Sequence, residues 1–169
     1  MRGSYYNEVE PFKAAWLREL MKANVIAPGE VDERSIVDVR PDDLHGFSQW
    51  HLFAGVGIWS YSLRGAGWPD DRLVMTASCP CQPFSAAGKG MGFEDERHLW
   101  PAAFELIKAI RPPVLLGEQV SSKDGLVWFG HVKRDLNSID YAVMGCDIPA
   151  SAFGAPHIRQ RLYFLGEAQ

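Results

Sequence analysis

The sequence predicts an α/β fold in which a doubly wound, mostly parallel sheet is covered by helices on both faces. Short apolar runs alternate along the chain with segments of helical periodicity, as they do in βαβ units. Hydrophobic residues make up 47% of the 169 residues, which is enough for a substantial core. No repeat, low-complexity tract or linker divides the chain. Residues 1–169 are therefore expected to form a single domain.

The N-terminal half of the chain predicts two helices and one strand. Pro11 suits the first turn of a helix, and the residues that follow at helical spacing are Phe12, Ala15, Trp16, Glu19 and Leu20. The expected elements are a helix over residues 11–24, a strand over residues 49–54 and a short helix over residues 58–66. Residues 32–48 are mostly polar. The opening residues 1–4 are typical of a vector-derived tag and are assigned no role.

The C-terminal half continues the alternation of strand and helix. The expected strands cover residues 73–78, 114–116, 141–146 and 161–165, and the expected helices cover residues 95–110 and 125–138. Pro112 and Pro113 end the first of these helices. Gly88, Gly90 and Gly92 predict a mobile loop over residues 84–94.

Composition limits the classes of protein to consider. The net charge is -4, so bulk attraction to nucleic acid is not expected, although local basic groups can still line one face. No apolar stretch approaches the roughly 20 residues that cross a bilayer, and no basic start precedes an apolar run, so we expect a cytoplasmic protein without a membrane partner. Three cysteines cannot all pair, which favours free thiols in a reducing compartment.

Cys81 is the strongest candidate for a chemical role. It lies between Pro80 and Gln82 at the end of an apolar run, so its backbone is constrained and its thiolate can be presented to a substrate. A buried structural thiol is the alternative. Redox chemistry is disfavoured because Cys79 and Cys81 lack a two-residue spacer. Metal binding is disfavoured because the cysteines and His98 lack zinc-type spacing.

A carboxylate and two guanidinium groups follow on later strands. Glu118 comes after an apolar strand, so it is expected at the same rim of the sheet as Cys81, where burial favours the protonated form and proton donation to a ring nitrogen. Capping of the next helix is the alternative role. Arg159 and Arg161 lie one pleat apart on the same side and suit a carbonyl or phosphate held in fixed geometry. Solvated surface charge is the alternative for these two.

A glycine-rich segment, Phe53-Ala54-Gly55-Val56-Gly57, closes one strand and opens a helix. Its glycines let the backbone approach a nucleotide-like ligand beside the helix N-terminus. A tight turn without a ligand is equally consistent with so short a motif.

Together these segments resemble the DNA cytosine-5 methyltransferase family over most of the chain. The glycine-rich segment resembles its cofactor loop. Residues 80–85 (Pro-Cys-Gln-Pro-Phe-Ser) resemble its nucleophile motif, and residues 92–97 resemble its closing loop. Residues 118–120 (Glu-Gln-Val) resemble its Glu-Asn-Val with one substitution, and residues 159–161 resemble its Arg-x-Arg.

The resemblance implies a Rossmann-like fold of the S-adenosylmethionine-dependent methyltransferase type and methyl transfer to C5 of cytosine in DNA. The target base swings out of the duplex, Cys81 adds to C6 and Glu118 contacts N3. Arg161 holds the cytosine O2, Arg159 supports that site or the DNA backbone, and residues 84–97 close over the base. The residues implied for the substrate site and closing loop are Gln82, Ser85 and Arg97.

The same resemblance implies S-adenosyl-L-methionine as the cofactor and no metal. Residues 53–57 and Pro80 belong to its expected binding site. Glu8 resembles the acid that holds the cofactor ribose, and Asp32 resembles the acid that contacts the adenine, with Glu30 as its rival.

The order of the motifs departs from the family. Only 24 positions separate Gly57 from Cys81, where the family places two further cofactor motifs, and here both resemble segments upstream. We therefore expect a circular permutation, which a doubly wound sheet tolerates when the cut lies in surface connections. Nothing after Gly166 resembles the target-recognition region, so a catalytic domain without that region is expected over residues 1–169.

Two other functions stay open at this point. The first is a noncatalytic DNA- or cofactor-binding subunit that needs a second protein chain carrying the recognition region. The second is a methyltransferase that acts on RNA or on a free pyrimidine.

Overall fold

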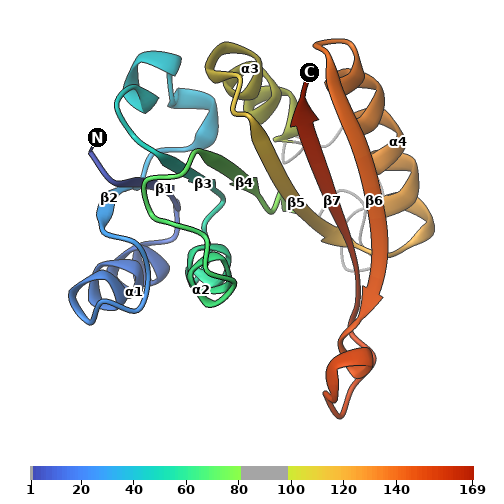
Figure 1. The fold of residues 1–169 in the computed structure, drawn as a ribbon, viewed down its shortest axis with the longest axis horizontal. Coiled ribbons are helices and arrows are strands. Elements are labelled where there is room, and N and C mark those ends of the chain that lie inside the picture. The colour runs from blue at the N-terminus through green and yellow to red at the C-terminus, as the bar shows by residue number, and fades with distance from the viewer. Residues whose placement is uncertain (1, 81–98) are drawn as a thin grey trace.

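Seven strands form one sheet within residues 2–80 and 99–169, which the computed structural model describes. The strands lie in the order β2-β1-β3-β4-β5-β7-β6 (Figure 1). Their bounds are Ser4–Asn7 for β1, Gly29–Asp32 for β2, Gln49–Leu52 for β3, Val74–Ala77 for β4, Val114–Val120 for β5, Tyr141–Pro149 for β6 and Gln160–Ala168 for β7. The strands from β2 to β5 pair in parallel, whereas β7 is antiparallel to both β5 and β6. The predicted mostly parallel sheet is confirmed.

Helices cover both faces of this sheet. Their bounds are Pro11–Lys22 for α1, Ile58–Gly65 for α2, Trp100–Ile110 for α3 and Lys123–Asn137 for α4. α1 and α2 lie on one face, and α3 and α4 lie on the other with two short 3-10 helices, Ile36–Asp38 and Pro41–Leu44 (Figure 1). The sheet is therefore doubly wound, as predicted. None of the helices in the described ranges is long and apolar enough to cross a membrane.

Alternation along the strands divides the core into two clusters. Tyr5 packs with Trp50, Leu115 and side chains of α3 and α4 in the larger cluster. Its neighbour Tyr6 faces the opposite way and packs with Leu17 beneath α1. The larger cluster, under α3 and α4, therefore holds most of the buried apolar surface that stabilises the fold.

The β5–β7–β6 part of the sheet has one covered and one accessible face. α4 packs against β6 and β7 on the covered side. On the accessible side Met144 is 65% exposed and Tyr163 is 37% exposed. Glu118 of β5 lies directly opposite Tyr163 of β7, so the two share this accessible face. The sheet thus presents the Glu118 side chain beside α2.

The N-terminal residues belong to the fold, which corrects the interpretation of residues 1–4 as a tag without a role. Ser4 begins β1 and is completely buried. The Arg2 guanidinium donates hydrogen bonds to both carboxylate oxygens of Glu30, at 2.9 and 2.8 Å. The Arg2 backbone N–H also donates to the Gly46 carbonyl at 2.8 Å. These contacts tie the start of the described chain to β2 and to the segment before β3.

The stretch expected to be polar between residues 32 and 48 contributes to the core. It holds the two 3-10 helices, which bury Ile36 and Leu44. The strand just before it, β2, was also missed. Isolated apolar residues in a short segment give no periodic signal, so contacts with α3 rather than local pattern decide their burial.

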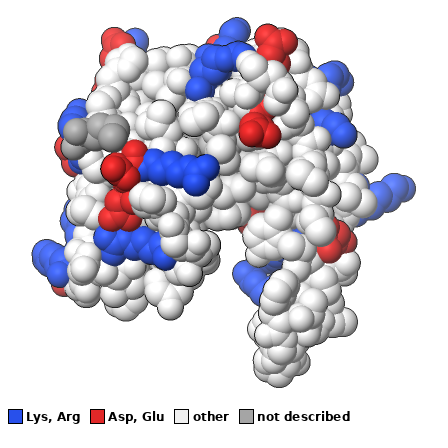
Figure 2. Space-filling model, viewed as in Figure 1, with Lys and Arg blue, Asp and Glu red and all other residues white. Residues whose placement is uncertain are grey.

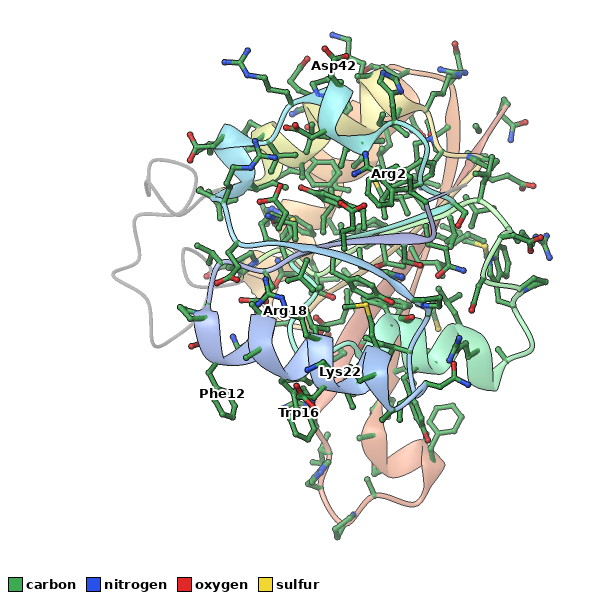
Figure 3. The ribbon with its side chains drawn as sticks, turned by 90° about the vertical axis from the view of Figure 1, so that its left-hand side faces the viewer. Arg2, Phe12, Trp16, Arg18, Lys22 and Asp42 are labelled. Atoms are coloured by element: carbon green, nitrogen blue, oxygen red, sulfur yellow. The ribbon has the colours of Figure 1, made fainter. Side chains whose placement is uncertain are left out.

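The apolar face expected for the first helix is wrong. α1 buries Ala14 and Leu17. Phe12 and Trp16 are instead 73% and 46% exposed and point away from the molecule (Figure 3). The small Ala14 allows α1 to approach the sheet closely, and the bulky aromatic residues are turned outward.

Element boundaries differ most on the strands that carry the predicted site. β5 continues to Val120, well beyond the expected residues 114–116, because β7 pairs with it as far as Val120 opposite Arg161. Glu118 therefore lies inside a strand rather than after one. The expected loop over residues 84–94 and the start of the helix expected from residue 95 lie outside the described residues.

Candidate active site

A cavity of about 500 Å³ lies where the loop after β3 meets β5 and β7, and we call it the Glu118 cavity. Figure 2 shows the surface hollowed between the part built on α1 and α2 and the projecting end of the β6–β7 hairpin. The lining residues are Phe53, Ala54, Gly55, Val56, Ile58, Trp59, Ser62, Ser78, Glu118, Arg159, Arg161 and Tyr163. The cavity thus joins the glycine-rich segment, the carboxylate and both arginines that were singled out in the sequence.

Glu118 and Arg161 form an ion pair inside this cavity. Arg161 Nε lies 2.6 Å from Glu118 Oε1, and the two side chains are 22% and 25% exposed. Burial raises the pKa of Glu118 above its usual value, although the charges of Arg161 and Arg159 act in the opposite direction. A carboxyl group with a raised pKa keeps its proton closer to neutral pH. The pair with Arg161 is made by the carboxylate, so donation of a proton to a ring nitrogen of a bound base requires Glu118 to leave this pair.

Glu118 does not cap the helix that follows it. The N-cap of α4 is Ser122, whose Oγ accepts a hydrogen bond of 3.0 Å from the Gly125 N–H. The alternative of a capping acid is therefore excluded, and the Glu118 side chain is available to the cavity.

Arg159 reaches the cavity from the turn before β7. Its backbone is left-handed, with φ of 35°, which is strained for a residue with a side chain. The turn is held by a 2.7 Å hydrogen bond from the Ala150 N–H to the Ile158 carbonyl. Arg159 and Arg161 line the same cavity, as their spacing of one pleat predicts.

The glycine-rich segment turns sharply between β3 and α2, and its two glycines serve different purposes. Gly55 and Gly57 have φ of 58° and 82°. A Cβ at Gly55 would meet no atom within 4 Å, so open space adjoins its backbone. A Cβ at Gly57 would lie 3.0 Å from Leu17 Cδ2. Gly55 therefore leaves room for a ligand, whereas Gly57 lets the N-terminus of α2 pack against α1.

A second cavity of about 460 Å³ adjoins the first, and we call it the Glu8 cavity. The Glu8 carboxylate accepts hydrogen bonds from the backbone N–H groups of Gly55, at 2.8 Å, and Glu10, at 3.0 Å. Phe53, Gly55 and Ser78 line both cavities. The full lining is Asn7, Glu8, Val9, Glu10, Lys13, Ser35, Ile36, Phe53, Gly55, Ser78, Pro80 and Leu99. An anchored carboxylate next to exposed glycine backbone suits the hydroxyl groups of a nucleoside.

The two acids expected near an adenine lie apart from the Glu8 cavity. The Asp32 carboxylate is held by Arg34, with Nη2 2.6 Å from Oδ2. Glu30 forms an ion pair with Arg2. Both acids line a different depression. Ser35 and Ile36, from the segment after β2, line the Glu8 cavity in their place.

Four predicted residues, Cys81, Gln82, Ser85 and Arg97, lie outside the described residues, so their placement stays a prediction. Pro80, directly before Cys81, lines the Glu8 cavity. Ser78 is anchored to α2 because its Oγ accepts a 2.8 Å hydrogen bond from Trp59 Nε1. The chain therefore leaves the described part at the junction of the two cavities.

The cysteines that the structure describes are both free, and neither lines the Glu118 cavity. Cys79 belongs to the larger core cluster, where burial raises the pKa of its thiol. Cys146 is exposed on β6. Among the described residues no group of three or more His, Cys, Asp or Glu is arranged to hold a metal ion.

Five lining residues of the Glu118 cavity were missed in the sequence: Ile58, Trp59, Ser62, Ser78 and Tyr163. The Trp59 and Tyr163 rings meet edge to face, with centroids 6.1 Å apart. Tyr163 follows Arg161 by two positions on β7, so strand alternation could have found it. Trp59 and Ser78 give no such signal, because only the parallel pairing of β3 with β4 brings their segments together.

Comparison with solved structures shows which fold the chain shares with known proteins. The methyltransferase EhMeth of Entamoeba histolytica superposes with a TM-score of 0.63 over 98% of this chain and 44% of that chain, at 16% identity. DNMT2 of Spodoptera frugiperda gives a TM-score of 0.62 over 97% of this chain and 42% of that chain, at 14% identity. At such low identity the likeness concerns the fold alone. The fold is the Rossmann-like α/β fold that these two methyltransferases share.

Sequence comparison assigns the chain to one family. The model of the C-5 cytosine-specific DNA methylase family matches residues 68–169, and the chain belongs to that family. The type II methyltransferase M.NgoBI of Neisseria gonorrhoeae is 37% identical over 100 residues, which are 57% of this chain and 32% of that protein. M.NaeI of Lentzea aerocolonigenes is 31% identical over 161 residues, which are 94% of this chain and 32% of that protein. The chain thus spans about a third of the length of these curated relatives.

Proposed function

We propose that this chain catalyses methyl transfer from S-adenosyl-L-methionine to C5 of cytosine in DNA. The observation that carries the proposal is the junction of the two cavities. One cavity contains the Glu118–Arg161 pair and the other contains Glu8. Phe53, Gly55 and Ser78 line both cavities. Because the two cavities adjoin at these shared residues, a substrate bound in each can react with the other without a large movement of the sheet.

The residues of the Glu8 cavity fit an adenosyl group. The Glu8 carboxylate retains acceptor capacity for ribose hydroxyls beyond its two backbone hydrogen bonds. Open space beside the Gly55 backbone allows close approach. We assign the adenine side to Ser35 and Ile36 rather than to Asp32. When bound, S-adenosyl-L-methionine supplies an electrophilic methyl group at its sulfonium.

The Glu118 cavity provides what a flipped-out cytosine requires. The bound base separates the Glu118–Arg161 ion pair: Glu118, which then takes up a proton, hydrogen-bonds to N3, and the Arg161 guanidinium holds O2. Attack by the Cys81 thiolate forms a sulfur–C6 bond and moves an electron pair to C5, which becomes nucleophilic. After C5 is methylated, loss of its proton restores the C5–C6 double bond and expels the thiolate. Arg159 supports the O2 site or the DNA backbone.

We also propose that the chain is a circular permutation of the usual methyltransferase order. In a doubly wound sheet of the order 3-2-1-4-5, the glycine-rich loop follows the first strand of the chain. Here the order is β2-β1-β3-β4-β5 and the loop follows β3. Assigning β3 the role of first strand, with β1 and β2 as second and third, reproduces the usual order.

Several finer expectations stay predictions. Gln82, Ser85 and Arg97 are assigned to the segment that closes over the base. A second protein chain carrying target recognition and a cytoplasmic location are likewise expectations from the sequence.

The direct test is incubation with labelled S-adenosyl-L-methionine and mixed-sequence DNA, followed by nucleoside analysis. We expect label in 5-methylcytosine, and a covalent complex with DNA that contains 5-fluorocytosine. Cys81→Ser removes the nucleophile and abolishes both signals. The matched control is Cys146→Ser, which changes an exposed cysteine outside the Glu118 cavity and keeps both signals. Label in another nucleoside, or full activity of Cys81→Ser, contradicts the proposal.

A further inference from the structure

The β6–β7 hairpin continues beyond the end of β5 as a projecting arm, which we define as residues 148–161. β5 pairs with β7 only as far as Arg161, and the arm extends past that point, away from the sheet (Figure 1). Its end is a 3-10 helix, Ala150–Phe153, followed by a turn. Hydrogen bonds from the N–H groups of Gly154 and Ala155 to Ser151 and Ala150 order this tip.

The arm tip carries apolar side chains that the fold leaves exposed. Phe153 is 82% exposed, more than any other large apolar residue in the described ranges, and Ile158 is 68% exposed. Neither side chain serves the core of the chain. An ordered tip that presents a phenylalanine to solvent suits contact with another molecule.

The charge of the arm points to an anionic partner. Its charged residues are Arg159 and Arg161, and it contains no Asp or Glu, whereas the whole chain has a net charge of -4. The charge of Arg161 is balanced by Glu118 of β5, so Arg159 supplies the net positive charge of the arm. The lower end of the arm shows no acidic atoms in Figure 2. An aromatic ring next to arginine, without carboxylates, is the combination that contacts nucleic acid strands.

The arm tip lies beside the Glu118 cavity, which we propose to hold the base. A cavity of about 370 Å³ on the arm is lined by Ile148, Ala150, Phe153, Arg159, Arg161 and Tyr163. The last three of these residues also line the Glu118 cavity. A base that enters the Glu118 cavity remains attached to its strand, so the flanking nucleotides must lie at the mouth of that cavity. The arm forms one side of this mouth.

We infer that the arm tip binds the DNA strand beside the extruded cytosine, with the Phe153 ring stacked on a neighbouring base and Arg159 facing a phosphate. The inference rests on the proposed function in taking DNA as the substrate. Extrusion of a base leaves its neighbours without a stacking partner, and an aromatic side chain can replace part of what is lost. The tip thereby favours the extruded state of the substrate.

The test compares Phe153→Ala with Phe12→Ala, an exposed phenylalanine on α1 that is turned away from the molecule (Figure 3). The probe is a duplex with one cytosine opposite adenine, whose extrusion is easier than that of a paired base. Phe153→Ala is expected to weaken binding by about 5-fold to 100-fold, the range for loss of one stacked base. Phe12→Ala keeps the affinity of the unaltered chain, and Phe153→Trp restores it.

Salt dependence separates stacking from charge. Phe153→Ala leaves the slope of log Kd against log salt unchanged, whereas Arg159→Gln reduces it by about one. Both variants keep the affinity for S-adenosyl-L-methionine and the melting temperature, because the two side chains are exposed on the arm.

Three results for DNA affinity would overturn the inference, and a fourth would assign the tip to a protein contact. Unchanged DNA affinity in Phe153→Ala overturns the inference, as does an equal loss in Phe12→Ala. A change in oligomeric state on sedimentation without a change in DNA affinity shows that the tip contacts protein instead. Absence of DNA binding by the unaltered chain at low salt overturns the inference as well. Phe153-dependent binding without label in 5-methylcytosine overturns the proposed function and leaves the inference standing.

Discussion

The Glu8 carboxylate accepts hydrogen bonds from the backbone N–H groups of Gly55 and Glu10. It thereby joins the segment after β1 to the glycine-rich segment after β3. Glu8→Gln keeps the size of the side chain but loses its charge and one acceptor oxygen. We expect the affinity for S-adenosyl-L-methionine to fall by about 10-fold to 100-fold, the range for a hydrogen bond to a charged group. Isothermal titration calorimetry measures this loss.

The matched control for this change is Glu30→Gln, an acid of similar chemistry that lines another depression. Its affinity for the cofactor should equal that of the unaltered chain. Equal losses in the two variants would show that the Glu8 cavity is not the cofactor site.

The side chains that gather in the Glu118 cavity were the feature of this molecule that the sequence predicted best. Glu118, Arg159 and Arg161 converge on one cavity, as their positions on neighbouring strands indicate. Ser35 and Ile36 could not be predicted, because their segment forms an irregular 3-10 turn without periodicity. Asp32 pairs with Arg34 and lies outside the Glu8 cavity, an arrangement that the sequence does not reveal.

Helix α4 contains two glycines whose replacement should act in opposite directions. A Cβ at Gly125 would lie 2.1 Å from the Val120 carbonyl oxygen, and backbone cannot move away cheaply. A Cβ at Gly130 would meet no atom within 4 Å. We expect Gly125→Ala to lower the free energy of unfolding by about 1–3 kcal/mol. Gly130→Ala should raise it by about 0.5–1 kcal/mol, because alanine restricts the unfolded chain.

Urea denaturation of both variants, followed by circular dichroism, measures these free energies. Stabilisation by both changes would mean that the start of α4 is not packed against the end of β5 as described. Because both substitutions add the same methyl group to the same helix, helix propensity alone cannot produce opposite signs.

Elements were predictable where periodicity was long and uninterrupted. The segments of α2 and α4 were found within a few residues. β1 and β2 were missed although β3 and β4 are equally short, because neither has an apolar run such as the one in β4 or the one that continues β3 through Phe53 and Ala54. The buried face of α1 was predicted wrongly. Phe12 and Trp16 have helical spacing, but the helix buries Ala14 against the sheet and leaves both aromatic residues exposed.

Stability of the whole molecule should depend on pH through His51, which lies buried in β3. The imidazole hydrogen-bonds with Thr76 Oγ1 at 2.9 Å and Gln49 Oε1 at 3.2 Å, and it stacks on Tyr6. Burial lowers the pKa of His51 from 6.5 to about 3. Between these values the unfolded chain binds a proton that the folded chain does not. The stabilising contribution is therefore complete above pH 6.5 and is lost as the pH falls toward 3.

The free energy of unfolding should decline between pH 6.5 and 5, above the range in which most carboxylates titrate. Urea titrations at several pH values measure this decline, and His51→Gln should flatten it. The exposed His45 provides the control, since His45→Gln should leave the decline intact. An unchanged slope in His51→Gln would show that another group is responsible.

The sequence by itself determined the chemical groups: a cysteine next to a proline, an acid, two arginines and a glycine-rich segment. These follow from residue type and short spacing, which any chain displays locally. Only the tertiary structure decided that Glu8 binds Gly55, 47 positions away, and that both adjoin the Glu118 cavity. Such contacts depend on the order in which parallel strands pair. That order is set by burial over the whole sheet, and no local pattern encodes it.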